Sequence, residues 1–250
     1  KVKQCNTKID VNSENQLRIT LFLVVGENVI IKELEENKMK NIICPFCQEL
    51  VEPKKSIVGK NRIIAETPKF VVFPTTGGIV DNYQLIVPKE HINCFGELTL
   101  DELKELKEII EWQKEINKKY FNSSFSMFEH GALYPSNESG KSIIHAHLHI
   151  FPNNISLLDE ISKYNFETEE IDDINDLRQI CHEYEKYLYY RDVNGKNYIM
   201  THQGIPSQFL RMVLANSLQK QEWNWREYPL IDVIEKNLEF YKEKKLIYRK

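Results

Sequence analysis

Three histidines at alternate positions, His145, His147 and His149, constrain the fold of this 250-residue chain more than any other feature. Alternate side chains of an extended strand point to the same face, so the three imidazoles would share one face of a strand predicted over residues 142–151. The opposite, buried face would hold the apolar residues Ile144, Ala146, Leu148 and Ile150. A face of three imidazoles indicates a site for a metal ion or an anion; the alternative is a polar, solvent-exposed face without a ligand.

A Cys-x-x-Cys pair, Cys44 and Cys47, is the second informative motif. Such a pair is typical either of thiol redox chemistry or of half of a tetrahedral zinc site. A zinc site needs two further ligands, for which His91 and His145 are candidates, with Cys94 a competitor for the third place. A closed Cys2His2 site would be structural, because no coordination position would be left for water.

Composition and charge exclude several other classes of protein. Hydrophobic residues make up 42% and charged residues 28%, which argues against disordered, collagen-like and coiled-coil chains. The net charge of -4 argues against a protein that coats duplex nucleic acid. The longest apolar run, residues 19–25, is far shorter than the roughly 18 residues of a membrane span, so we expect neither a span nor a secretory signal.

The number of cysteines indicates the redox state of the cellular compartment in which the protein resides. Five cysteines, an odd number in a long chain, do not suit a secreted disulfide scaffold. We therefore expect a reducing, cytoplasmic environment.

The remaining pattern predicts strands mixed with helices. Thr99, with Glu102 three residues later, predicts a capped helix that runs to about residue 120. Residues 153–185 are acidic and predicted to be helical, and Asn194-Gly195 predicts the turn of a hairpin. Further strands are predicted at residues 16–25, 28–31, 62–65, 70–73, 83–87, 124–129, 187–191 and 198–202, and further helices at 207–218 and 231–242.

Together these motifs resemble the histidine-triad (HIT) superfamily of nucleotide-binding hydrolases and transferases. The family pattern His-x-His-x-His followed by apolar residues is matched at 145–151, and an apolar strand ending in Pro-Lys-x-His is matched at 85–91. Many members begin with Cys-x-x-Cys, as here at Cys44. The family's Glu-x-Gly is matched loosely by Glu129 to Gly131. The resemblance covers about residues 42–152.

The resemblance implies roles for the histidines. His147 corresponds to the nucleophile, which attacks the α-phosphorus of a nucleotide and forms a covalent nucleotidyl-histidine. His149 would hydrogen-bond the phosphoryl oxygens, and a histidine there favours the hydrolase branch, because the transferase and phosphorylase branches carry Gln. His145 would complete a structural Zn2+ site with Cys44, Cys47 and His91.

Other residues are candidate contacts of the nucleotide or its phosphates. Ser142 matches the family's serine before the triad and would contact the phosphate or the leaving group. Lys141 either meets a phosphate or is a solvated loop lysine, and His130 is either a phosphate contact or a loop histidine. Asn82, where members carry Gly-His nearby, is a candidate contact. Either Gln208 or Arg211 reaches over the triad to hold the distal part of the substrate, or this segment only borders a small apolar core.

The expected fold class is α+β: a HIT-like antiparallel β-sheet with one main helix, followed by an extension of mixed helices and a hairpin. The expected organisation is an amino-terminal β-hairpin at residues 1–40, a HIT domain at 41–152 and a carboxy-terminal extension at 153–250.

The expected function is hydrolysis of a nucleoside phosphoanhydride or phosphoramidate through a nucleotidyl-histidine, releasing a nucleoside monophosphate. The alternatives are a nucleotidyltransferase or phosphorylase of the same superfamily, an aprataxin-like DNA-adenylate hydrolase, and a module that binds nucleotides without catalysis. The expected partner is a nucleotide substrate, with no membrane and no nucleic acid. A homodimer, usual among small members, is one candidate assembly.

Overall fold

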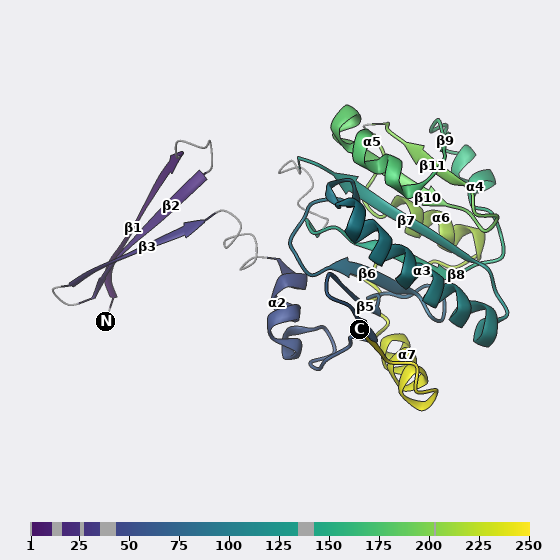
Figure 1. The fold of residues 1–250 in the computed structure, drawn as a ribbon, viewed down its shortest axis with the longest axis horizontal. Coiled ribbons are helices and arrows are strands. Elements are labelled where there is room, and N and C mark those ends of the chain that lie inside the picture. The colour runs from purple at the N-terminus through teal and green to yellow at the C-terminus, as the bar shows by residue number, and fades with distance from the viewer. Residues whose placement is uncertain (1, 12–16, 26–27, 36–43, 135–142, 203) are drawn as a thin grey trace.

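The structure is a computed structural model, which describes residues 2–11, 17–25, 28–35, 44–134, 143–202 and 204–250. Its strands form two sheets (Figure 1). The smaller sheet consists of β1 (Val2–Val11), β2 (Leu17–Val25) and β3 (Asn28–Glu35), all antiparallel in that order. The predicted pair of strands is thus present as β2 and β3, and β1 is a third strand, which was not predicted.

The larger sheet has nine strands in the order β12-β4-β5-β6-β8-β7-β10-β11-β9. Every neighbouring pair is antiparallel except β12 with β4. The strands are β4 (Ala65–Glu66), β5 (Phe70–Pro74), β6 (Gln84–Pro88), β7 (Phe125–Ala132), β8 (Leu148–Pro152), β9 (Glu169–Ile171), β10 (Lys186–Arg191), β11 (Asn197–Met200) and β12 (Tyr248–Arg249). Strands β9 to β12 follow residue 152, so the carboxy-terminal segment extends the same sheet.

The helices connect and cover these strands. They are α2 (Pro45–Val51), α3 (Leu100–Phe121), α4 (Leu158–Ser162), α5 (Leu177–Tyr184), α6 (Phe209–Ser217) and α7 (Ile231–Glu243), with 3-10 turns η1 (Pro53–Lys55), η2 (Phe95–Glu97) and η4 (Ile174–Asp176). None of the described helices has the length and apolar character that a membrane span requires.

Helix α3 confirms the predicted capping box. The backbone N–H of Glu102 donates to the Thr99 hydroxyl at 3.3 Å, and the Thr99 N–H donates back to the Glu102 carboxylate at 2.9 Å. The helix ends at Asn122, whose φ of 46° is left-handed, a conformation that Asn tolerates better than most residues. Its apolar stripe packs on the large sheet through Leu103 and Leu106.

The two faces of the large sheet carry separate cores, because side chains alternate along each strand. Leu148 and Ile150 of β8 belong to the core under α3 and α5. Phe151 points to the other face and packs with α4 and α6, and on that same face α2 packs against Phe73 and its neighbours in β5 and β6. Figure 1 shows α3 across one face and α6 behind the sheet. The fold class predicted from the sequence is therefore confirmed.

The triad strand differs from its prediction. Strand β8 begins only at Leu148, so His145 and His147 precede it in irregular backbone. The neighbouring strand β6 ends at Pro88, which has no N–H to donate, and its carbonyl accepts from the His145 ring at 2.8 Å. Residues 143–147 therefore have no strand partner, and Ile144 is 40% exposed, contrary to the predicted buried position.

Candidate active site and metal cluster

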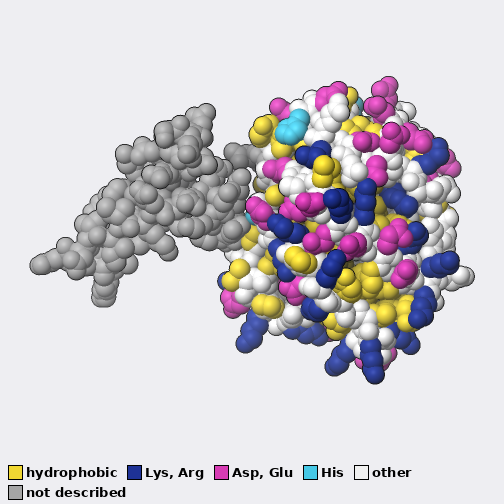
Figure 2. Space-filling view, viewed as in Figure 1, with side chains coloured by type: hydrophobic (Ala, Val, Ile, Leu, Met, Phe, Trp, Pro, Cys, Tyr) yellow, Lys and Arg dark blue, Asp and Glu magenta, His cyan; other side chains and the backbone are white. Residues whose placement is uncertain are grey.

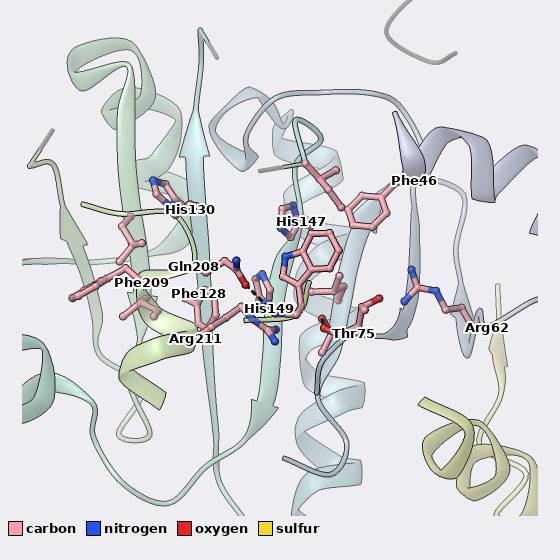
Figure 3. Close-up of a pocket in the computed structure, with 17 residues that line it drawn as sticks. Phe46, Arg62, Thr75, Phe128, His130, His147, His149, Gln208, Phe209 and Arg211 are labelled. Carbon is pink, nitrogen blue, oxygen red and sulfur yellow. Dashed lines mark hydrogen bonds between the residues drawn. The ribbon is translucent and has the colours of Figure 1, made fainter. Parts of the chain in front are cut away.

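A cleft lies on the sheet face between α2 and α6 (Figure 3). Its floor is formed by sheet residues including Leu85, Phe128 and His149, and its walls include Phe46 of α2 and the first turn of α6. The cleft encloses about 780 Å³ including its open mouth.

His147 lines this cleft with one ring nitrogen already occupied. Its Nδ1 lies 2.7 Å from the carbonyl oxygen of His145. A carbonyl oxygen can only accept, so Nδ1 carries the proton and, in the neutral ring, Nε2 carries the lone pair. Burial is the main cause that lowers the His147 pKa, so the neutral, nucleophilic form is favoured. The hydrogen bond to the backbone therefore leaves the lone pair of the neutral ring on Nε2.

His149 lies beside His147 in a more enclosed position. The two ring centroids are 5.1 Å apart, and the His149 ring stacks on Phe128 at 4.3 Å. His149 Nδ1 lies 3.0 Å from the hydroxyl of Tyr83, a buried residue to which the sequence analysis assigned no role. Burial first, and then the charges of His147 and Arg211, lower the His149 pKa well below its usual value. A neutral His149 keeps one N–H to donate.

The first turn of α6 brings a cation to the same cleft. Arg211 is 2% exposed; its Nε donates to the Trp223 carbonyl at 3.0 Å and its Nη2 to the Gly77 carbonyl. Its guanidinium carbon lies 5.5 Å from the centroid of the Tyr83 ring. A guanidinium is positively charged and only donates hydrogen bonds, so it favours the orientation in which the Tyr83 oxygen faces it. The Tyr83 hydroxyl proton then points towards His149 Nδ1. The His149 Nε2–H then remains as the donor.

Gln208 also lines the cleft, at the start of α6. Its φ of 63° is left-handed, and its side chain does not cap the helix. Instead, Gln208 Nε2 donates to Asn224 at 3.1 Å, and Oε1 accepts from the Trp225 N–H at 3.3 Å. Gln208 thus fixes the segment around Trp225 against the cleft. Its predicted contact with substrate stays a prediction.

The four predicted metal ligands form one compact cluster. One ligand atom from each of Cys44, Cys47, His91 and His145 lies within 4.8 Å of the other three. His145 Nδ1 is 3.4 Å from the sulfur atoms of both Cys44 and Cys47, and His91 Nδ1 is 3.3 Å from Cys47 Sγ. Nitrogen and sulfur ligands of a tetrahedral zinc ion are separated by roughly 3.5 Å.

The chemistry of the cluster fits a metal ion such as zinc. Because His145 Nε2 donates its proton to the Pro88 carbonyl, Nδ1 presents its lone pair to the two sulfur atoms. Burial and the adjacent Cys44 raise the pKa of Cys47 to about 12, so a thiolate at this position needs a cation beside it. Helix α2, which carries Cys47, begins at Pro45 directly after Cys44.

Cys94, the competing ligand, lies elsewhere. It is buried in the core under α3 and begins η2, and Cys181 is buried in that same core. Both belong to the free cysteines of the described residues. The third ligand position is therefore filled by His91 in the cluster, as the Pro-Lys-x-His match implies.

The other predicted contacts fall in three places. Ser142 and Lys141 lie outside the described residues. His130 lines the cleft as an exposed residue of β7 (Figure 3). Asn82 does not line the cleft: it is buried and bonded to Asn117, Gln84, Tyr241 and Asn237. This correction follows from the left-handed φ of 56° at Asn82, which turns the residue into a polar network that joins α3, β6 and α7.

The fold and the arrangement of the histidines are similar to those of the histidine-triad superfamily. Residues 44–163 match the family model described as "Scavenger mRNA decapping enzyme C-term binding". This segment contains the triad, the metal cluster and the main helix, and we assign it to the histidine-triad superfamily. No match to the chain is found among curated protein sequences.

Several solved structures are similar to this chain. Yeast Ap4A phosphorylase Apa2 in complex with Ap4A shares 12% identity over 80% of this chain and 73% of its own, with a TM-score of 0.41. A HIT family protein from Bacillus anthracis shares 18% identity over 45% of this chain and 74% of its own, with a TM-score of 0.35. A HIT family hydrolase from Clostridium thermocellum shares 17% identity over 45% and 91%, with a TM-score of 0.32.

Proposed function

We propose that this chain hydrolyses a nucleoside phosphoanhydride or phosphoramidate through a covalent nucleotidyl-His147 intermediate and releases a nucleoside monophosphate. The observation that carries the proposal is the hydrogen bond from His147 Nδ1 to the His145 carbonyl, which leaves Nε2 as a lone-pair nitrogen in the cleft. Histidine is suited to this role because its neutral form is a good nucleophile and its phosphoryl adduct is labile.

The reaction has two displacements. His147 Nε2 attacks the α-phosphorus, an N–P bond forms, and the bond from phosphorus to the bridging oxygen or nitrogen breaks, so that the leaving group takes up a proton. Water then attacks the same phosphorus, the N–P bond breaks, and the electron pair returns to His147. The His149 Nε2–H donates to the phosphoryl oxygens, where negative charge develops in both transition states.

The cluster supports this site from the side of α2. We propose that it holds structural zinc, which would fix α2 and the segment before β8 to each other. His145 contributes twice, since its ring faces the cysteines while its carbonyl orients His147. Phe46, between the two cysteines, packs edge-on against His147 with ring centroids 5.5 Å apart.

The family match supports a substrate with two linked nucleosides. The matched model describes a scavenger decapping enzyme, whose name refers to mRNA caps. We propose a dinucleoside polyphosphate as the substrate class.

A panel of dinucleoside polyphosphates, a cap dinucleotide and nucleoside phosphoramidates, scored for nucleoside monophosphate, tests the assignment. Monophosphate formation without added inorganic phosphate supports hydrolysis. Turnover that requires inorganic phosphate and yields only diphosphate would instead identify a phosphorylase.

The face of the molecule shown in Figure 2 gives no support to a duplex-binding role. On the face that Figure 2 shows, Lys and Arg side chains are interspersed with Asp and Glu over the described residues. A protein that binds the phosphate backbone presents a basic tract instead. We therefore retain a nucleotide, and not nucleic acid, as the proposed partner.

A further inference from the structure

Arg211 is a buried cation whose charge is not balanced by protein. Its Nη1 is buried and has no hydrogen-bond partner among the described residues. The ion pairs of the described residues do not include Arg211, whereas Arg62 at the other side of the cleft forms a bidentate pair with Glu49. A buried guanidinium without a counter-ion is costly, so an anion in the cleft would stabilise it.

The helix that carries Arg211 adds a second feature that favours an anion. Residues 207–211, at the start of the nine-residue helix α6, line the cleft. The first N–H groups of a helix have no partner within it and carry partial positive charge. The Phe209 N–H donates to the Pro206 carbonyl at 3.2 Å, and the Gln208 side chain does not cap the N–H groups that follow, since it is bonded to Asn224 and Trp225.

The backbone around Arg211 is shaped to hold the guanidinium in place. Gly77, whose carbonyl accepts from Nη2, has a φ of +67°, and a Cβ at this position would lie 2.9 Å from Nη2. Trp223 holds Nε on the other side. Two of the three guanidinium nitrogens are thus fixed by carbonyls, and the third, Nη1, has no hydrogen-bond partner among the described residues.

We propose that Arg211 and the first turn of α6 form a second phosphate subsite, which binds the phosphate next to the one attacked by His147. This inference rests on the proposed function and deepens it, because it selects substrates that carry at least two linked phosphates. The carboxy-terminal segment then contributes directly to specificity, and a nucleoside phosphoramidate with one phosphate uses only the triad.

Comparison of two substrates tests the subsite. In Arg211→Gln, kcat/KM for a dinucleoside polyphosphate should fall about 10- to 100-fold further than kcat/KM for a nucleoside phosphoramidate, the effect of one charge-assisted contact. Arg178→Gln, an exposed arginine of α5, is the matched control and should change neither. Equal losses for both substrates would mean that Arg211 is only structural, and would overturn the proposal.

Binding in the absence of turnover separates this inference from the proposed function. In a His147→Ala background, inorganic pyrophosphate should bind at least about 10-fold more tightly than inorganic phosphate by calorimetry, and the added Arg211→Gln change should remove that difference. A difference that persists would overturn the subsite even if His147 is the nucleophile. If Arg211→Gln does not fold, Arg211→Lys can be used, because it keeps the positive charge but lacks the several N–H donors of a guanidinium. It should reduce the difference in affinity between pyrophosphate and phosphate, and an unchanged difference would again contradict the subsite.

Discussion

The His145 carbonyl oxygen accepts a hydrogen bond from His147 Nδ1 at 2.7 Å, while the His145 ring faces the sulfur atoms of Cys44 and Cys47 at 3.4 Å. One residue therefore connects the metal cluster with the proposed nucleophile. Since residues 143–147 lie outside the sheet, the cluster and the Pro88 carbonyl replace strand pairing as the support of this segment.

Replacement of the nucleophile should abolish turnover and leave the structure intact. For His147→Ala we expect kcat to fall at least about 10³-fold, because no other residue among those described in the cleft has a lone-pair nitrogen placed beside His149. Metal content and circular dichroism should match wild type. His182→Ala, an exposed histidine of α5, is the control and should keep full activity. Near-normal turnover in His147→Ala would refute the mechanism.

Loss of a cluster ligand should act first on stability. Cys47→Ala should reduce bound zinc from one per chain to well below half, and should lower the melting temperature, because the three remaining ligands, Cys44, His91 and His145, lose their ion. Cys94→Ala tests the competing cysteine and should retain the metal. A chelated wild-type protein with an unchanged melting temperature would remove the structural role of the cluster.

The Tyr83 hydroxyl should act by positioning His149. Tyr83→Phe removes the partner of His149 Nδ1 at 3.0 Å, so the ring can adopt the other tautomer and lose its donor to phosphate. We expect kcat to fall about 10-fold with little change in KM. Tyr190→Phe, which removes a buried hydroxyl bonded to the Leu157 N–H, should lower stability but leave kcat unchanged. A change confined to KM would contradict the positioning role.

Glu129 should make stability depend on pH. Burial raises its pKa from 4.5 to about 8, with Glu97 adding to the rise, while the Tyr187 hydroxyl and the Phe95 N–H oppose it. The neutral form is favoured in the folded state, so its stabilisation is full below pH 4.5 and is lost as the pH rises through 8.

The Glu129→Gln variant isolates this contribution. Gln stays neutral at every pH, whereas folding of the wild type disfavours ionised Glu129. Between pH 4.5 and 8 the free energy of unfolding of the variant should therefore rise relative to that of wild type, by up to a few kcal/mol, on the order of the energy that corresponds to the pKa shift. Urea unfolding across this range measures the difference. A constant difference between the two proteins would show that Glu129 does not titrate there.

The parts of the fold that follow local rules could be predicted from the sequence. Thr99 and Glu102 specify the start of α3 through contacts three residues apart, and the turn at Gly195, with its φ of 88°, needs little tertiary context. The cluster could also be predicted, because a Cys-x-x-Cys pair that binds zinc needs two further Cys or His ligands, for which His91 and His145 are candidates. Its long-range geometry, from Cys44 to His145, came with the family resemblance.

Other features depend on contacts between distant residues. The start of β8 at Leu148 is decided by Pro88 in the adjacent strand, which alternation within residues 142–151 does not reveal. Asn82 was misplaced because its partners, such as Asn237, come from a helix far along the chain. Arg211 is a candidate contact from the sequence, but a specific role in phosphate binding can be argued only once its buried, unpartnered Nη1 is seen near the triad.

The most direct test of a covalent nucleotidyl-His147 intermediate is to measure the mass of the protein during turnover. Wild-type protein mixed with a dinucleoside polyphosphate and denatured within milliseconds to seconds should carry an added mass of one nucleoside monophosphate, and peptide mapping should locate it on His147. The adduct should be absent from His147→Ala and present in His182→Ala. Steady turnover without any adduct in wild type, or an adduct on another residue, would contradict nucleophilic catalysis by His147.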